Sequence, residues 1–253
     1  YEKSNVSFKR VYPSSNSPIL SFGQKLIFLR TLIFEQASIY HFYFTPETAT
    51  TKIFRLLKKL KSGGFLQTIA TPIKDLESPS NFIFGDHIVV QSQTTMNLLK
   101  SKGIERTSLI YPGTDLEKFH PGVSSENLRQ KLKIKPGDRI ILYPGHYYLN
   151  CNDDLKKVVQ SLVREYPDTR FIFACRLAYQ SDNQAKNQIK DFLSRGNLSD
   201  RVFFFDTVEN MPELISLADI VIFPPRFMLE KSDIPMVLLE ALAMEKPIVI
   251  TDI

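Results

Sequence analysis

The chain has 253 residues, a length at which one large domain or two ordinary domains are expected. Hydrophobic residues make up 43% and charged residues 23%, which excludes a disordered chain and indicates a sizeable core. The formal net charge of +5 permits nucleotides, phospholipid surfaces or nucleic acid as partners, but selects none of them. Two cysteines, Cys151 and Cys175, are too few for a disulfide framework and point to a reducing compartment.

No apolar run reaches the roughly 18 residues that cross a bilayer, because polar side chains interrupt the most apolar stretch, residues 18–44. The chain begins at Tyr1, shows no signal-peptide pattern, and stops at Ile253 directly after an expected buried strand. We therefore expect a fragment of a cytoplasmic protein, truncated at both ends.

Apolar runs of strand length alternate with amphipathic stretches of helical length in the first half. Strands are expected over residues 39–44, 65–69, 87–91 and 108–111, and helices over 49–60 and 94–102. Residues 115–138 break this rhythm with Pro-Gly turns and a short helix, and so predict a domain boundary. We place an incomplete N-terminal domain in residues 1–135 and an incomplete C-terminal domain in residues 136–253.

The same alternation resumes in the second half. Strands are expected over residues 139–143, 170–175, 202–205, 220–223 and 247–250, and helices over 154–165, 184–195, 211–216 and 235–244. Strands separated by helices predict parallel βαβ units, and several strands are apolar on both faces, as strands covered by helices on both sides are. The expected fold class is α/β, with two Rossmann-like, doubly wound domains.

Ligands of open parallel sheets bind beyond the carboxyl ends of the strands, where loops lead into helix N-termini. The sharpest junction of this kind precedes the helix expected at 235–244. Asp233 is a candidate N-cap, Pro235 suits the first helical turn, and Lys231 would place an ammonium group where a diphosphate needs one. Glu240 lies in an apolar run of this helix, where its carboxylate needs partners such as ligand hydroxyls. A capped surface helix is the alternative.

Residues 232–249 resemble the signature of the retaining glycosyltransferases of group 1 (family 4), which have the GT-B fold. That signature has two glutamates separated by seven residues, then a small-residue helix, a Lys-Pro pair and a strand. Residues 89–92, 109–121 and 217–224 resemble other segments of the family in the same order. The resemblance implies a hexosyltransferase that uses a nucleotide-diphosphate sugar as co-substrate, has no cofactor or metal, and transfers to a carbohydrate or lipid-linked acceptor.

The resemblance also implies a donor subsite on the C-terminal domain. The residues expected in it are Gly145, His146, Arg176, Lys231, Asp233, Ile234, Pro235, Met236, Val237 and Glu240. Glu240 matches the second signature glutamate, which binds the donor ribose, whereas Ser232 replaces the first. His146 and Cys151 fall where the family has a phosphate-binding arginine and lysine, so Lys231 and Arg176 are the expected cationic substitutes. Gly145 would let the backbone approach the donor closely.

On the acceptor side, His41 at the end of the first strand best matches a histidine of the family and is the candidate catalytic residue. Packing among the neighbouring aromatic residues is the alternative. His87 and His120 have no partner at metal-ligand spacing, so we expect no metal. The basic amphipathic helix over residues 52–61 is either a solvated face or a peripheral contact with anionic lipid at the inner face of the membrane.

Transfer of a sugar from a nucleotide donor to an unidentified acceptor, with retention of configuration, is the leading hypothesis. A UDP-sugar epimerase on the same architecture would need no acceptor. A non-catalytic relative would bind a nucleotide sugar or a partner protein without turnover, and the replaced glutamate, arginine and lysine favour it. No base-reading motif accompanies the positive charge, so nucleic acid is not an expected partner.

Overall fold

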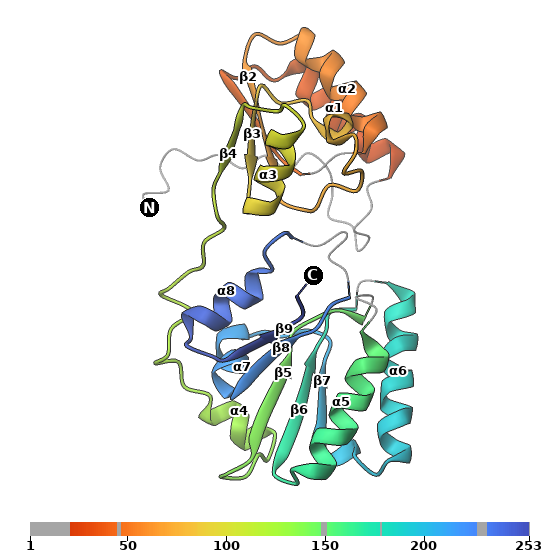
Figure 1. Ribbon diagram of the computed structural model, residues 1–253, viewed down its shortest axis with the longest axis vertical. Helices are drawn as coiled ribbons and strands as arrows, with labels where there is room; N and C mark the ends of the chain where they lie inside the picture. Colours follow the sequence, from red (N-terminus) through yellow and green to blue (C-terminus); the bar gives the residue numbers. More distant parts are fainter. Residues whose placement is uncertain (1–20, 45–46, 148–150, 178, 227–231, 253) are drawn as a thin grey trace.

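The computed structural model describes residues 21–44, 47–147, 151–177, 179–226 and 232–252. Within these residues, two parallel sheets form two α/β domains, which lie one above the other in Figure 1. The expected fold class, two Rossmann-like domains, is thus confirmed. In this part of the chain, no helix is both long and apolar enough to cross a membrane.

The N-terminal domain holds a four-stranded sheet in the order β1-β2-β3-β4. Its elements are α1 (Phe22–Phe34), β1 (Ile39–Tyr43), α2 (Thr48–Lys59), β2 (Gly64–Ile69), η2 (Pro79–Phe82), β3 (His87–Val90), α3 (Gln93–Ser101) and β4 (Thr107–Leu109). Burial alternates along β1, so that Tyr40 and Phe42 pack with Phe54, Phe65 and Phe84 in an aromatic core. This alternation is the period-two pattern that a strand with one buried face requires.

The helix α1 has no counterpart among the expected elements. Its apolar residues are spread around the helix, so that Phe28 and Leu29 pack against the aromatic core while Phe22 and Leu26 stay exposed. Ser21 starts the helix, because its hydroxyl accepts the Gln24 N–H in a capping box. Without a single apolar stripe, the sequence gives no helical period to detect.

The C-terminal domain holds a five-stranded parallel sheet in the order β7-β6-β5-β8-β9. Its elements are β5 (Arg139–Tyr143), α5 (Asn152–Glu165), β6 (Thr169–Ala174), α6 (Gln180–Arg195), η4 (Ser199–Arg201), β7 (Val202–Phe205), α7 (Met211–Leu217), β8 (Ile220–Phe223), α8 (Met236–Ala243) and β9 (Ile248–Ile250). Tyr143 and Phe173 face a core under α5 and α6, whereas Leu142 and Ile172 face a core under α7 and α8. Apolar side chains on both faces match a sheet covered by two helix layers.

The segment between the sheets packs on the C-terminal domain. Its helix α4 (Glu126–Lys131) lies beside α7, and Leu128 and Ile134 join the core that α7 and α8 cover. The Leu128 N–H donates to the Glu213 carboxylate at 3.1 Å, and the Ser216 hydroxyl donates to the Val123 carbonyl. The packing therefore differs from the expected boundary at residue 135, because residues 119–134 share their core with the second domain.

Candidate functional site

Hydrogen bonds join the carboxyl ends of the two sheets. Asp233 lies between β8 and α8, and Ala70 directly follows β2. The backbone N–H of Asp233 donates to the Ala70 carbonyl at 2.9 Å. Its carboxylate accepts from the Ser92 hydroxyl at 2.7 Å and from the Thr95 hydroxyl at 2.6 Å, at the start of α3. The strand ends of both domains thus face each other, and this is the position at which parallel α/β sheets bind ligands.

The prediction that Asp233 caps α8 is wrong. The N-cap of α8 is Pro235, and no side chain makes a capping hydrogen bond there. The carboxylate of Asp233 points instead to the other domain, because two hydroxyls of α3 compete for it with the nearer helix. Local spacing could identify only the nearest helix. The consequence is an α8 N-terminus, next to Ile234, Met236 and Val237, without a capping side chain in the described part of the chain.

Glu240 lies one turn into α8 and is half-buried. Burial raises the pKa of its carboxyl group above the ordinary value. Within the described residues, no donor reaches this carboxylate, and burial is the single cause of the shift. A desolvated carboxylate without a donor is costly, and the hydroxyls of a bound ligand would compensate that cost.

A buried tyrosine shapes the loop after β5. The Tyr143 hydroxyl lies 3.0 Å from the His146 carbonyl oxygen and 3.3 Å from the Cys151 sulfur, and it accepts the His146 N–H. A side-chain Cβ at Gly145 would meet the Tyr143 ring at 2.0 Å. The packing of this ring thus requires a glycine at position 145. The expected reason was a close approach of the backbone to the donor.

The thiols in this region supply no charge. Burial raises the pKa of Cys151, and it also raises that of Cys175 far above its ordinary range. Both therefore stay protonated thiols at neutral pH.

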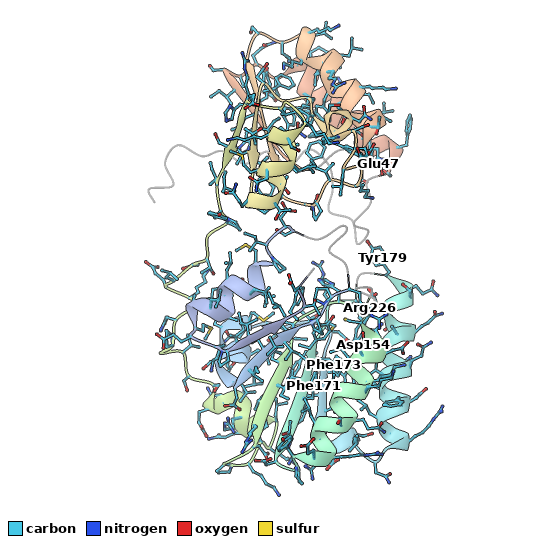
Figure 2. The ribbon with its side chains drawn as sticks, in the orientation of Figure 1. Glu47, Asp154, Phe171, Phe173, Tyr179 and Arg226 are labelled. Carbon is cyan, nitrogen blue, oxygen red and sulfur yellow. The ribbon has the colours of Figure 1, made fainter. Side chains whose placement is uncertain are left out.

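Arg226 is a cation that the sequence analysis missed. It follows β8, and its Nε and Nη2 atoms each lie 2.9 Å from an oxygen of Asp154 in the first turn of α5 (Figure 2). This bidentate pair places a guanidinium near Cys151, whose pKa nevertheless stays raised because burial outweighs the nearby charge. The two partners are 72 residues apart, so no local motif reveals them. Of the expected cations, Arg176 is exposed just beyond β6, and Lys231 lies outside the described residues.

His41 lies in the middle of β1, not at its end as expected, since the strand continues to Tyr43. Its Nε2 atom is 2.7 Å from the Thr68 hydroxyl oxygen, and the residue is exposed on the face opposite the aromatic core. Tyr43 shares this face at the carboxyl end of the strand, where the Gln91 amide donates to its hydroxyl at 2.6 Å. Tyr43 and Gln91 were missed, although the alternation of β1 puts Tyr43 on the same face as His41.

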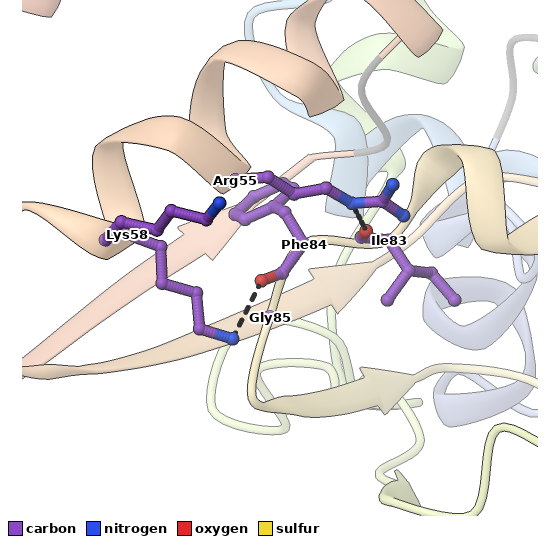
Figure 3. Close-up of a pocket in the computed structure, with 6 residues that line it drawn as sticks. Arg55, Lys58, Ile83, Phe84 and Gly85 are labelled. Carbon is purple, nitrogen blue, oxygen red and sulfur yellow. Dashed lines mark hydrogen bonds between the residues drawn. The ribbon is translucent and has the colours of Figure 1, made fainter.

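Two basic side chains of α2, Arg55 and Lys58, have a structural role. Arg55 donates to the Ile83 and Ser80 carbonyls at 3.0 and 2.6 Å, and Lys58 donates to the Phe84 carbonyl at 3.3 Å. These residues line an open recess of about 540 Å³ on the N-terminal domain (Figure 3). The recess holds cations already engaged with backbone oxygens. No group of three metal-ligating side chains occurs among the residues that the structure describes.

Comparison with known sequences points to one family. Residues 138–253 match the family model described as Glycosyl transferases group 1. The protein named "Putative glycosyltransferase EpsD" of Bacillus subtilis is 26% identical over 164 residues, which are 61% of this chain and 40% of EpsD. Spore coat protein SA of the same organism is 24% identical over 126 residues, 46% of this chain and 33% of that protein. The chain thus spans less than half the length of these curated relatives.

Solved structures share the fold over nearly the whole chain. Anabaena HepE, solved in complex with UDP and glucose, has a TM-score of 0.71 and 16% identity, and the match covers 93% of this chain and 65% of HepE. Sucrose-phosphate synthase from Thermosynechococcus elongatus has a TM-score of 0.69 and 17% identity, covering 90% of this chain and 60% of the synthase. The two facing α/β domains are therefore of GT-B type.

Proposed function

We propose that this protein is a glycosyltransferase that takes a sugar from a nucleotide-diphosphate donor, with retention of configuration, and passes it to a carbohydrate or lipid-linked acceptor. The family match covers the C-terminal domain, where the donor would bind. HepE, of the same fold, has been solved with UDP-glucose, which makes a UDP-sugar the first donor to test.

Glu240 carries this proposal. A half-buried carboxylate with a raised pKa and no donor among the described residues is costly unless a ligand completes it. A ribose diol supplies two hydroxyl donors, and each hydrogen bond to the charged oxygens would contribute about 1.5–3 kcal/mol. The position, one turn inside a helix at the carboxyl edge of the sheet, fits a nucleoside.

The departing diphosphate needs positive charge. The α8 N-terminus offers N–H groups and a partial positive charge. Arg226 after β8 and Arg176 after β6 follow the carboxyl ends of two strands that flank β5 in the same sheet. Lys231, of whose position nothing is described, is the expected further cation. Stabilisation of the leaving group in this way needs no side-chain nucleophile, metal or other cofactor. His41 would act on the acceptor side as the catalytic residue.

Calorimetric titration of the full-length protein with UDP, GDP and ADP tests the donor site. We expect one nucleotide to bind and Glu240→Ala to weaken it at least about tenfold, the equivalent of one charge-assisted hydrogen bond. The control is Glu209→Ala, which removes an exposed carboxylate elsewhere on the domain. If no nucleotide binds, or if both variants bind alike, the donor assignment fails.

Product analysis separates transfer from the two alternatives. An epimerase would convert the bound sugar nucleotide without an acceptor, and a non-catalytic relative would bind it without any product. A transferase releases the nucleoside diphosphate in proportion to the glycosylated acceptor. The retained anomeric configuration is read from the same product.

We also propose that the outer surface of α1 and α2 contacts anionic lipid. Phe22, Leu26, Leu56 and Leu60 are exposed there, with Lys52 and Lys59 beside them on α2. Apolar side chains flanked by cations are typical of interfacial helices. Sedimentation with phosphatidylglycerol vesicles should recover the protein, and a Leu56→Ser, Leu60→Ser variant should bind them less. Equal recovery with neutral vesicles would contradict this contact.

A further inference from the structure

Asp233 hydrogen-bonds to three residues of the opposite domain. The backbone N–H bonds the Ala70 carbonyl at 2.9 Å, and one carboxylate oxygen accepts from both Ser92 and Thr95 at 2.7 and 2.6 Å. Thr95 is buried, and its hydroxyl has this carboxylate as an acceptor. These contacts span at least 138 residues of sequence, so they link two separately formed sheets.

The helix α3 is prepared to receive a negative charge at this point. Ser92 is its N-cap and accepts the Thr95 N–H at 3.1 Å. The Ser92 hydroxyl oxygen lies 2.7 Å from the Asp233 carboxylate and 3.1 Å from the Thr95 hydroxyl oxygen, and the charged oxygen is the nearer acceptor for its one hydrogen. A carboxylate at a helix N-terminus is stabilised by the partial positive charge there. Two charge-assisted bonds to one oxygen add to this stabilisation.

The anchored segment leads directly into the donor side. Only Ile234 and the N-cap Pro235 separate Asp233 from the first residue of α8. The position of the α8 N-terminus is therefore fixed by the N-terminal domain as well as by its own sheet. A proline with a restricted φ leaves little freedom between the anchor and the helix.

We propose that Asp233 is a positioning residue that clasps the two domains together, and that this clasp aligns the α8 N-terminus with the acceptor side. Asp233 thus acts through α3 and not by touching the donor. The inference rests on the proposed function only for its effect on transfer. The clasp itself is a property of the protein without any ligand.

Domain opening can be measured without ligand by fluorescence energy transfer. Ser101→Cys on α3 and Ser194→Cys on α6 are exposed labelling positions, whereas Cys151 and Cys175 are buried and react slowly. We expect Asp233→Ala and Thr95→Val each to shift the equilibrium toward open forms at least about tenfold, since each removes a bond to a charged group. Thr95→Ser, which keeps the hydroxyl, should restore closure. The matched control is Thr94→Val, an exposed neighbour.

Kinetics then distinguish positioning from donor binding. In Asp233→Ala the dissociation constant for UDP should stay within about twofold, while kcat falls about tenfold or more because the two halves are no longer aligned. A combined Asp233→Ala, Thr95→Val variant should lose no more than Asp233→Ala alone, since Asp233→Ala already removes the contact with Thr95.

Two outcomes would overturn the clasp. One is energy transfer that stays unchanged in Asp233→Ala and Thr95→Val, and the other is a weakened UDP affinity with domains still closed. The ligand-free measurement keeps the two proposals apart. If the wild-type protein binds no nucleotide but opens in the variants, the donor assignment fails and the clasp stands.

Discussion

At the scale of one residue, the carboxyl group of Glu240 is expected to lower the stability of the ligand-free protein and to strengthen nucleotide binding. Burial raises the pKa of its carboxyl group, so the native protein holds this proton to a higher pH than the unfolded chain does. The free energy of unfolding therefore falls as pH rises from the unfolded pKa through the raised native one. Once ionised, the carboxylate costs stability, which is the behaviour expected of the ligand-binding group that we propose.

Replacing this carboxylate with a neutral amide should separate the two effects. We expect Glu240→Gln to raise the melting temperature of the ligand-free protein at pH 7 and to weaken UDP binding about tenfold. The gain in stability should shrink as pH falls toward 4, where the wild-type carboxyl group becomes protonated as well. Thermal scans at several pH values, with Glu209→Gln as control, measure this change in melting temperature. A lower melting temperature in Glu240→Gln would show that the carboxylate already has a partner.

Arg226 is paired with Asp154, and that pairing holds its charge away from a ligand. If the guanidinium serves the donor diphosphate, Arg226→Gln should weaken UDP about tenfold, as the loss of one charge-assisted bond does. Asp154→Asn should have the opposite effect and tighten UDP, because it frees the cation. The exposed pair itself contributes at most about 1 kcal/mol to stability, so both variants should fold. UDP affinities that do not change in opposite directions would assign Arg226 a structural role alone.

At the scale of elements, the β5–α5 junction depends on one glycine. A Cβ at position 145 would lie 2.0 Å from the Tyr143 ring, which is fully buried and cannot move away. We expect Gly145→Ala to destabilise the protein by about 3 kcal/mol, the upper range for overpacking. In a Tyr143→Leu background, Gly145→Ala should destabilise the protein much less, because the ring that the Cβ would meet is gone. Chemical denaturation measures the loss of stability. The control is Gly113→Ala, because no atom lies within 4 Å of a Cβ at that position.

The start of the β5–β6 pair depends on an ion pair that is almost buried. Burial alone would raise the pKa of Asp138. Hydrogen bonds from the Lys135 backbone N–H and the Arg170 guanidinium outweigh burial and hold that pKa below its ordinary value. The side chains of Asp138 and Arg170 are 7% and 13% exposed, and the Arg170 Nε atom lies 3.1 Å from a carboxylate oxygen of Asp138. A lowered native pKa contributes stability above the unfolded pKa of about 3.9, and this is lost as pH falls through the native value.

Asp138→Asn tests this contribution. At neutral pH the variant should lose about 3 kcal/mol, because Arg170 is left nearly buried without its charge partner. The difference from wild type should narrow below pH 4. The neighbouring Asp168, paired with Arg139 on the surface at 3.4 Å, provides a matched control whose change to Asn should cost under about 1 kcal/mol. Equal losses in both variants would contradict the argument from burial.

Period and length of apolar runs predicted the strands and most helices, because each of these elements buries a regular face. They could not predict α1, whose apolar residues follow no single face. The residues of α8 were predicted from a contiguous segment, and Glu240 lies where that segment implied. Asp233 was assigned to the wrong helix and Arg226 was missed, since their partners Thr95 and Asp154 lie in distant parts of the chain. Contacts across long sequence distances come from sheet assembly, which local patterns do not contain.

At the scale of the whole molecule, each domain has its own cores. The aromatic core of Phe42 and Phe54 belongs to the first sheet, whereas Phe171 and Phe173 pack on the second (Figure 2). Among the described residues, the chain after β4 and the hydrogen bonds of Asp233 connect these units. Domains with separate cores can move relative to each other unless their interface is large. The bonds of Asp233 are therefore the place where ligand binding on one domain can influence the other.

Hydrogen exchange resolves this influence by domain. At about 100 times its dissociation constant, a nucleotide stabilises the domain that binds it by about 2.7 kcal/mol, which slows globally exchanging amides about 100-fold. We expect this slowing in β5 and β6 of both wild type and Asp233→Ala. Amides of β2 and α3 should slow in wild type alone, and by about twofold at most, because a UDP dissociation constant within twofold of wild type in Asp233→Ala limits the coupling that Asp233 carries between the domains. Protection that spreads to β2 and α3 equally in Asp233→Ala would mean that the domains communicate through the chain after β4 instead.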